Sequence, residues 1–299
     1  MKFFNFYKEG ILKLGIKHEY GMIDVEKAAQ FYPYDGLPAL PTTVMGVIRS
    51  GPSEYEALNR YIASLPPPEE QSPYGLNESS IIWGPCVDSP QKLICVGLNY
   101  KKHAYETNLP IPEYPILFNK FNNALTGHGA VIPIPSETVK VDYEVELAIV
   151  IGKTARNVPI ADSLDYVFGY CIANDVSARD LQLLTGQWML GKTCDSFCPL
   201  GPYLTTADEV GDPNDLHMKT TVNGDVRQNS HTSDMIFTCA DTISYISRHF
   251  TLQPGDVIMT GTPEGVIMGY PPDKQHYLKR GDEVVLEIEK LGILQNRFY

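Results

Sequence analysis

The sequence lacks any long hydrophobic run. None of its uninterrupted apolar stretches approaches the ~20 residues that a membrane-spanning helix requires. Four charged side chains interrupt residues 1–14, so this segment has no apolar region of the kind found in secretory signals. We therefore expect a protein that is neither embedded in a membrane nor exported.

Basic residues are scarce relative to acidic ones. The 299-residue chain has 24 Lys and Arg against 36 Asp and Glu, which gives a formal net charge of −12. Such a balance argues against nucleic acids and anionic membrane surfaces as partners. It does not exclude a small anionic substrate, because a metal ion and a few basic side chains can reverse the sign of the charge inside a cleft.

Cysteines are few, and their spacing fits no known zinc site. Cys194 and Cys198 are the closest pair, and no second cysteine or histidine pair accompanies them. Buried free thiols behave as small hydrophobic side chains. With no secretory signal, reduced thiols are the simplest account, and we expect a cytoplasmic location.

The remaining composition is that of a folded globular protein, with 43% apolar and 20% charged residues. Many short stretches alternate apolar and polar residues and are joined by turn residues, which predicts a β-rich α+β protein with a few peripheral helices. A proline cluster at 66–68 divides the chain. We expect a small N-terminal domain over residues 1–80 and a larger domain over residues 91–299.

Residues 141–151 have the clearest pattern. Apolar residues occupy the odd positions, and acids occupy positions 142, 144 and 146, which predicts one continuous strand. Side chains two apart share a strand face at about 7 Å, so Glu144 and Glu146 project together with Asp142 beside them. Because Ala148 and Val150 continue the acidic face, we expect both faces of the strand to be buried.

Asp175 follows another strand-like run and could add a third carboxylate to those of Glu144 and Glu146. Three carboxylates without nearby His or Cys partners suit a hard cation, Mg²⁺ or Mn²⁺. A strand with a solvated acidic face is the commoner meaning of the Glu-x-Glu spacing by itself.

Two further pairs have helical spacing. His103 and Glu106 are three residues apart, so a carboxylate would lie beside an imidazole, as a general base requires. A surface pair on a mobile segment is the alternative. Arg179 and Gln182 are also three apart. The arginine could bind a substrate carboxylate, or it could pair with Asp180 or Asp195.

Five segments, taken in order, resemble the fumarylacetoacetate hydrolase family. They are GLNYKKHAYE (97–106), PILFNK (115–120), DYEVELA (142–148), NDVSARDLQ (174–182) and TGTPEGV (260–266). The resemblance extends from about residue 92 to residue 299. It implies a mixed β-sheet roll with a carboxylate metal site, preceded by a small N-terminal α/β domain, and it implies a homodimer.

The resemblance also assigns roles. It implies that Glu144, Glu146 and Asp175 hold Mg²⁺ or Mn²⁺. It also implies that His103 and Glu106 belong to a segment that becomes ordered over the active site, and that this pair activates a water molecule. Lys192 is expected on a strand, where it would stabilise enolate charge. We expect Arg179, Gln182 and Thr262 to bind the substrate.

These roles predict an enzyme acting on a 2-oxo acid. We expect hydrolytic cleavage of a C–C bond in an acylpyruvate-like 2,4-dioxo acid through a metal-chelated enolate. Decarboxylation of oxaloacetate and keto–enol or double-bond isomerisation use the same enolate and are alternatives. A non-catalytic protein that binds a metabolite or a protein partner is an alternative of another class.

Overall fold

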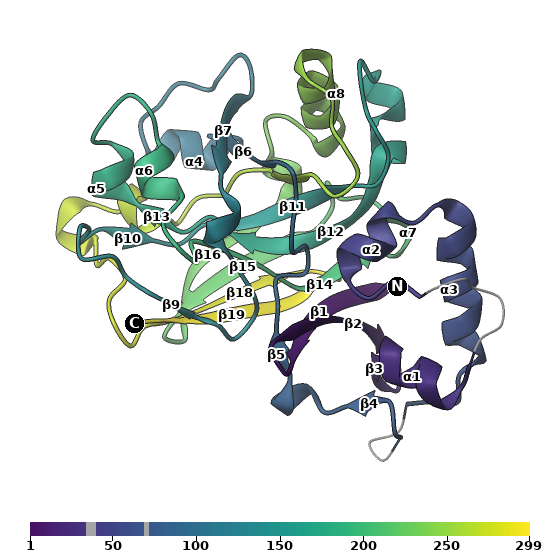
Figure 1. Cartoon of the computed structure of the whole chain (residues 1–299). Helices are drawn as coiled ribbons and strands as arrows, with labels where there is room; N and C mark the ends of the chain where they lie inside the picture. The colour runs from purple at the N-terminus through teal and green to yellow at the C-terminus, as the bar shows by residue number, and fades with distance from the viewer. Residues whose placement is uncertain (34–39, 69–71) are drawn as a thin grey trace.

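The computed structural model describes residues 1–33, 40–68 and 72–299, and two large sheets dominate it (Figure 1). The first has twelve strands, with β4-β3-β2-β1-β14-β12-β11-β17-β6-β7 in order, β5 beside β1 and β8 beside β14. Its strands are β1 (Lys2–Lys8), β2 (Ile11–His18), β3 (Gly21–Asp24), β4 (Gly75–Leu76), β5 (Ile82–Trp83), β6 (Leu93–Gly97), β7 (Ile116–Lys120), β8 (Leu125–Thr126), β11 (Val145–Ile151), β12 (Val167–Asn174), β14 (Cys198–Thr206) and β17 (Val257–Met259).

The second sheet has five strands in the order β16-β15-β18-β19-β9. These strands are β9 (Val131–Ile132), β15 (His217–Val222), β16 (Asp225–His231), β18 (Glu283–Ile288) and β19 (Gly292–Phe298). A small third sheet pairs β10 (Val141–Asp142) with β13 (Ser177–Ala178). Most pairings are antiparallel, so the predicted β-rich α+β class is confirmed.

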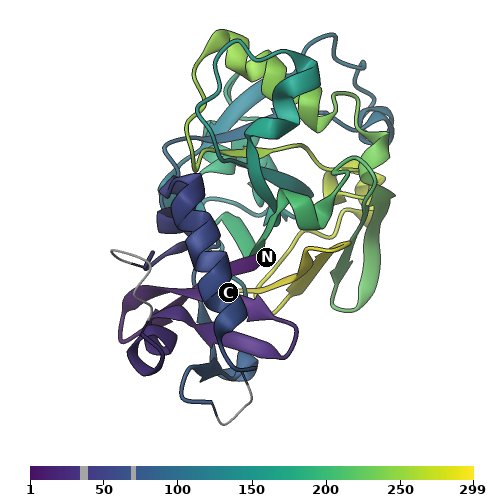
Figure 2. The same cartoon turned by 90° about the vertical axis from the view of Figure 1, so that its right-hand side faces the viewer.

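Helices lie around these sheets. They are α1 (Val25–Phe31), α2 (Val44–Arg49), α3 (Pro52–Ser64), α4 (Lys101–Glu106), α5 (Arg179–Gln182), α6 (Met189–Lys192), α7 (Ala207–Val210) and α8 (Cys239–His249). Among the described residues, no helix is both long and apolar enough to cross a bilayer. Helix α3 runs along the outer side of the N-terminal strands (Figure 2).

The N-terminal strands continue the main sheet. The turn between β1 and β2 places Glu9 and Gly10 at φ values of 54° and 76°, the left-handed backbone that a two-residue hairpin favours. Strand β1 then pairs with β14, far along the chain, so one sheet passes from the N-terminal segment into the rest. The division into residues 1–80 and 91–299 stays a prediction.

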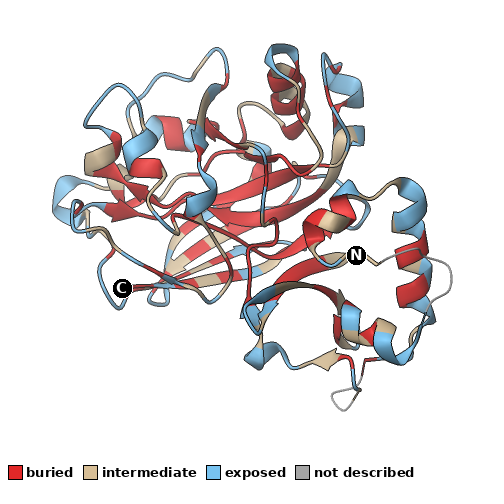
Figure 3. Ribbon diagram, viewed as in Figure 1, coloured by how far each residue is buried: buried red, intermediate tan, exposed pale blue. Residues whose placement is uncertain are grey.

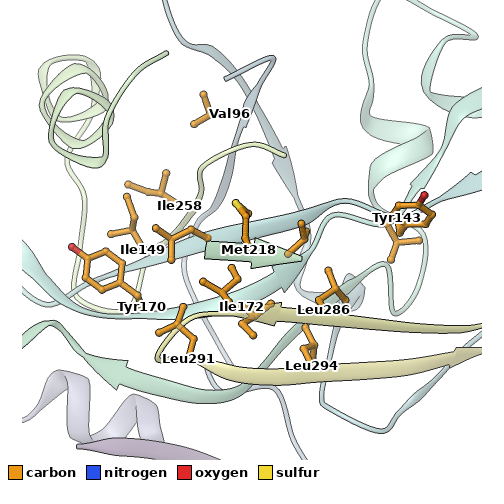
Figure 4. Packing of buried hydrophobic residues seen from close by; sticks show 14 of the residues in the cluster. Val96, Tyr143, Ile149, Tyr170, Ile172, Met218, Ile258, Leu286, Leu291 and Leu294 are labelled. Atoms are coloured by element: carbon orange, nitrogen blue, oxygen red, sulfur yellow. The ribbon is translucent and has the colours of Figure 1, made fainter. Parts of the chain in front are cut away.

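Strand β11 lies in the middle of the main sheet and is buried on both faces, as predicted (Figure 3). Its odd-numbered residues pack in one hydrophobic cluster, which Figure 4 shows around Ile149 and Ile172. Ala148 and Val150 belong to a second cluster on the opposite face, which also contains residues of the N-terminal strands and helices. Side chains of β11 therefore belong to both hydrophobic clusters, one on each face of the strand.

The prediction of one strand over residues 141–151 is wrong. The strand is interrupted at 143–144, because side chains of two distant residues accept backbone hydrogen bonds there in place of a neighbouring strand. The N–H of Glu144 donates to Asn174 Oδ1 and that of Val145 donates to Gln228 Oε1, both at 3.0 Å. The break separates Asp142 from the other two acids. The predicted strand at Lys192 is also wrong, since this residue ends helix α6.

Candidate functional site

A partly enclosed pocket lies between β6, β7, β11, the end of β12, and helices α4, α5 and α6. These three helices lie together at one end of the molecule, away from α1 and α3 (Figure 1). The cavity has a volume of about 80 Å³. Eight of the nine residues singled out from the sequence line it, and Glu106 lies behind His103. The eight are His103, Glu144, Glu146, Asp175, Arg179, Gln182, Lys192 and Thr262.

Three buried carboxylates meet in this pocket. Glu146 projects from β11, Glu144 comes from the break before it, and Asp175 directly follows β12. One oxygen from each lies within 4.8 Å of the others. The N–H of Asp175 donates to the Glu144 carbonyl at 3.0 Å, which fixes the spacing between the two segments.

Three buried cations surround the carboxylates. Lys192 Nζ lies 2.8 Å from Glu144 Oε2 and 2.6 Å from Asp175 Oδ2. Arg179 Nη2 lies 2.6 Å from Glu144 Oε1. Lys120 donates to Asp175 and, at 3.0 Å, to the carbonyl of Val176. Glu144 and Asp175 are therefore each paired with two cations.

The electrostatics separate Glu146 from its neighbours. Burial would raise the pKa of Glu144, but Arg179 and Lys192 outweigh it and hold that pKa well below its usual range. Burial, followed by the charges of Asp175 and Glu144, raises the pKa of Glu146 well above its usual range. The Gly261 N–H donates to Glu146 Oε2 at 2.8 Å, and no ion pair to Glu146 occurs among the described residues.

This arrangement fits a divalent cation. The three donors are hard oxygen ligands, as Mg²⁺ and Mn²⁺ prefer. Glu146 is a buried acid without an opposite charge, and such a group is costly unless a proton or a cation neutralises it. Asp142, expected beside the other acids, is not one of the three carboxylates that meet, and it pairs with Arg179.

Helix α4 carries His103 and Glu106 on one face. His103 Nδ1 lies 2.8 Å from Glu106 Oε1, and the Gly265 N–H donates to Glu106 Oε2 at 2.9 Å. His103 is 5% exposed. Because Nδ1 contacts Glu106, Nε2 is the ring nitrogen left to exchange a proton with a ligand. The two residues are brought together as the helical spacing predicted.

Arg179 and Gln182 share one face of α5, as expected. Arg179 Nη1 donates to Gln182 Oε1 at 3.0 Å, and Nε donates to Asp142 Oδ2 at 2.9 Å. The alternative ion pairs with Asp180 or Asp195 do not form. Asp180 instead accepts from Thr138 Oγ1 at 2.5 Å.

Thr262 follows β17 and is almost fully buried. Its hydroxyl donates to the Val145 carbonyl at 3.0 Å and accepts from Gln228 Nε2 at 2.9 Å. Gln228 also receives the Val145 N–H, so a single amide fixes both the strand break and Thr262.

Two charged residues of the site have contacts that were not predicted from the sequence. Lys120 belongs to the PILFNK segment but was given no role, although its place at the end of an apolar strand was a signal that the side chain is buried. Asp142 was expected beside Glu144 and Glu146 and was given no role of its own. Its actual function as a partner of Arg179, 37 residues away, has no local signal.

Comparison with known proteins gives consistent matches. The family profile described as "Fumarylacetoacetate (FAA) hydrolase C-terminal" matches residues 92–299. "Oxaloacetate tautomerase Fahd2a, mitochondrial" from Rattus norvegicus is 43% identical over 261 residues, which cover 87% of this chain and 80% of the relative. The name of this relative overturns the expected cytoplasmic location. Reduced thiols, on which that expectation rested, do not distinguish one reducing compartment from another.

Two solved structures extend the comparison. Fumarylacetoacetate hydrolase from Exiguobacterium antarcticum has a TM-score of 0.80 and 33% identity, covering 100% of this chain and 99% of that one. Fumarylpyruvate hydrolase from Pseudomonas aeruginosa, solved with Mn²⁺ and pyruvate, has a TM-score of 0.64 and 35% identity, covering 70% of this chain and 89% of that one.

Proposed function

The chain belongs to the fumarylacetoacetate hydrolase family, and from this we propose that it catalyses keto–enol tautomerisation of a short 2-oxo acid of the oxaloacetate class. Members of this family are enzymes, so the non-catalytic alternative is set aside. The observation that carries the proposal is the position of His103, backed by Glu106, in the pocket that holds the three carboxylates.

We infer that Glu144, Glu146 and Asp175 hold Mg²⁺ or Mn²⁺. When bound there, the ion would polarise the 2-oxo group and stabilise negative charge on its oxygen. Support comes from the oxygen-only donor set and from the buried Glu146 carboxyl group, which has no ion-pair partner among the described residues. A structurally similar fumarylpyruvate hydrolase was solved with Mn²⁺ and pyruvate.

The chain's own residues supply the proton transfer. In the keto-to-enol direction, His103 Nε2 would take a proton from the carbon next to the 2-oxo group and return it to the enolate oxygen, and the reverse reaction would run the other way. Glu106 would hold the ring and balance its positive charge while it carries the proton. Lys192 and Arg179 bring fixed positive charge to the pocket, where negative charge develops on the enolate.

The size of the pocket favours a short substrate. Its volume of about 80 Å³ is small beside the roughly 300–1,000 Å³ that is usual for ligand pockets. A four-carbon acid needs less room than an acylpyruvate with a long tail. The relative from Rattus norvegicus, named an oxaloacetate tautomerase, supports the same substrate class.

Hydrolytic cleavage of an acylpyruvate is the second candidate. The His103–Glu106 pair could equally deprotonate a water molecule. The named activity of the Pseudomonas aeruginosa structure, fumarylpyruvate hydrolase, supports this alternative. The homodimer implied by the sequence resemblance also stays a prediction, which sedimentation of the purified protein would test.

The test uses the purified protein with Mg²⁺ or Mn²⁺ and three substrates: enol-oxaloacetate, acetylpyruvate and fumarylpyruvate. Tautomerisation predicts faster loss of enol absorbance from oxaloacetate without formation of pyruvate. Pyruvate from oxaloacetate would indicate decarboxylation, and pyruvate from the other two substrates would indicate hydrolysis. No acceleration of any of these reactions, with or without metal, would refute the proposed function.

A further inference from the structure

The turn after β17, residues 265–269, contacts two separate parts of the site. Its Gly265 N–H donates to Glu106 Oε2 at 2.9 Å. Two residues later, the N–H groups of Ile267 and Met268 donate to the Asp142 carboxylate at 2.9 and 3.1 Å. The same short segment therefore fixes the acid behind the histidine and the acid behind the arginine.

Gly269, at the end of this turn, lies against the Glu106 carboxylate. A Cβ atom built on Gly269 would lie 2.5 Å from Glu106 Cδ and 2.6 and 2.8 Å from its two oxygens. Real Cβ atoms essentially never approach other atoms within 3.0 Å, so one of the two groups would have to move.

Backbone conformation does not explain this glycine. Gly269 is not among the glycines with positive φ, so alanine could adopt the same backbone there. The backbone of the 265–269 turn is held by two hydrogen bonds to Asp142, whereas the Glu106 carboxylate lies at the end of a flexible side chain. An added methyl group would therefore displace the Glu106 carboxylate rather than the turn.

We propose that Gly269 is a positioning residue, whose missing side chain leaves the space in which Glu106 holds His103 in its working orientation. Both oxygens of Glu106 are committed, Oε1 to His103 Nδ1 at 2.8 Å and Oε2 to the Gly265 N–H. A shift of the carboxylate breaks at least one of these contacts and leaves the imidazole without its support. The inference deepens the proposed function and rests on the role of His103 in it.

The first test compares Gly269→Ala with Gly186→Ala. Gly186 is exposed, has no positive φ and has no atom within 4 Å of the position that a Cβ would occupy, so it is a matched control. Gly269→Ala is expected to lower kcat by about 10- to 100-fold, the effect of a misplaced catalytic group. KM and Mn²⁺ affinity should stay near wild type, because the carboxylates and cations of the pocket are untouched. Gly186→Ala should leave every value unchanged.

The second test is rescue by a shorter acid. Glu106→Asp removes one methylene group, which withdraws the carboxylate from the position that a methyl group at residue 269 would occupy. By itself this substitution should slow turnover. Combined with Gly269→Ala, it should raise kcat above that of Gly269→Ala alone. A kcat for Gly269→Ala within twofold of wild type, or a double variant slower than both single variants, would overturn the inference.

A stability measurement separates this inference from the proposed function. If no 2-oxo acid is turned over, the proposed function fails, but steric coupling between the two positions can still be measured by thermal unfolding. Contacting residues show non-additive effects. The melting-temperature shift of the double variant should therefore differ by about 2 °C or more from the sum of the shifts of the two single variants. Additive shifts would refute the contact itself.

Discussion

Asp142 offers a sharp test of how the arginine of the site is held. Its carboxylate is fully buried and accepts hydrogen bonds from Arg179 Nε at 2.9 Å and from the N–H groups of Ile267 and Met268. In Asp142→Asn, one oxygen becomes an NH₂ group. Each oxygen accepts from two N–H groups, Oδ1 from Tyr143 and Ile267, and Oδ2 from Arg179 and Met268. Whichever oxygen is replaced, two buried donors would lose their acceptor.

The expected cost follows from these contacts. Removing one member of a buried ion pair costs about 3–5 kcal/mol. Because Arg179 keeps Glu144 and Gln182 as partners, we expect the lower end, about 3 kcal/mol. For 299 residues, an unfolding entropy of about 2.1 cal/mol/K per residue converts this to a fall in Tm of about 5 °C.

The assay is urea unfolding at pH 7, with kcat/KM measured on the same samples. The displaced arginine should lower kcat/KM by at least about tenfold, since misplaced groups in a site lose rate steeply. Asp165→Asn, which makes the same change at an exposed position, is the control and should leave both quantities unchanged. A loss of stability below about 1 kcal/mol, the size of one ordinary hydrogen bond, would refute the reasoning.

Three further predictions concern the pocket. His103→Gln should lower kcat by about 10²–10⁴-fold without changing Mn²⁺ affinity, as measured by calorimetry; unchanged turnover would exclude it as the acid–base group. Lys120→Met should cost about 3 kcal/mol in urea unfolding because it removes a buried partner of Asp175, whereas exposed Lys153→Met should cost nothing measurable. The folded-state pKa of Glu146 is raised, so the folded protein keeps a proton that the unfolded chain has lost. In EDTA the free energy of unfolding should therefore fall as pH rises above the ordinary carboxyl pKa of 4.5. Glu146→Gln should flatten that slope, and an equal slope in both proteins would contradict the pKa assignment.

Local patterns in the sequence predicted the elements that local forces determine. The alternating pattern through β11 predicted that both faces of the strand are buried, because side chains two residues apart share a face whatever the neighbouring strands are. The Asn223-Gly224 pair is typical of a two-residue hairpin turn, and the structure places both residues at positive φ between β15 and β16.

The interruption at 143–144 could not be predicted in this way. It depends on two side-chain amides, Asn174 and Gln228, which are 30 and 83 residues away from the N–H groups that they bind. Their positions are set by the packing of other strands. For the same reason the sequence placed Asp142 beside Glu144, whereas the break turns it toward Arg179.

The composition of the site was more predictable than its charge pairing. Helical spacing brought His103 to Glu106 and Arg179 to Gln182, and the family resemblance named the three carboxylates. The spacing did not reveal which cation pairs with which acid, because those partners come from different elements. Lys120, fully buried against Asp175, is the clearest example.

The central claim is that Glu144, Glu146 and Asp175 together bind one divalent cation. Calorimetric titration of the EDTA-stripped protein with Mn²⁺, beside the Glu146→Gln variant, tests this claim most directly. We predict one ion per chain in the wild type and an affinity at least about tenfold lower in the variant, since one of three charged ligands is lost. Absence of binding to the wild type, or equal binding to both proteins, would contradict it.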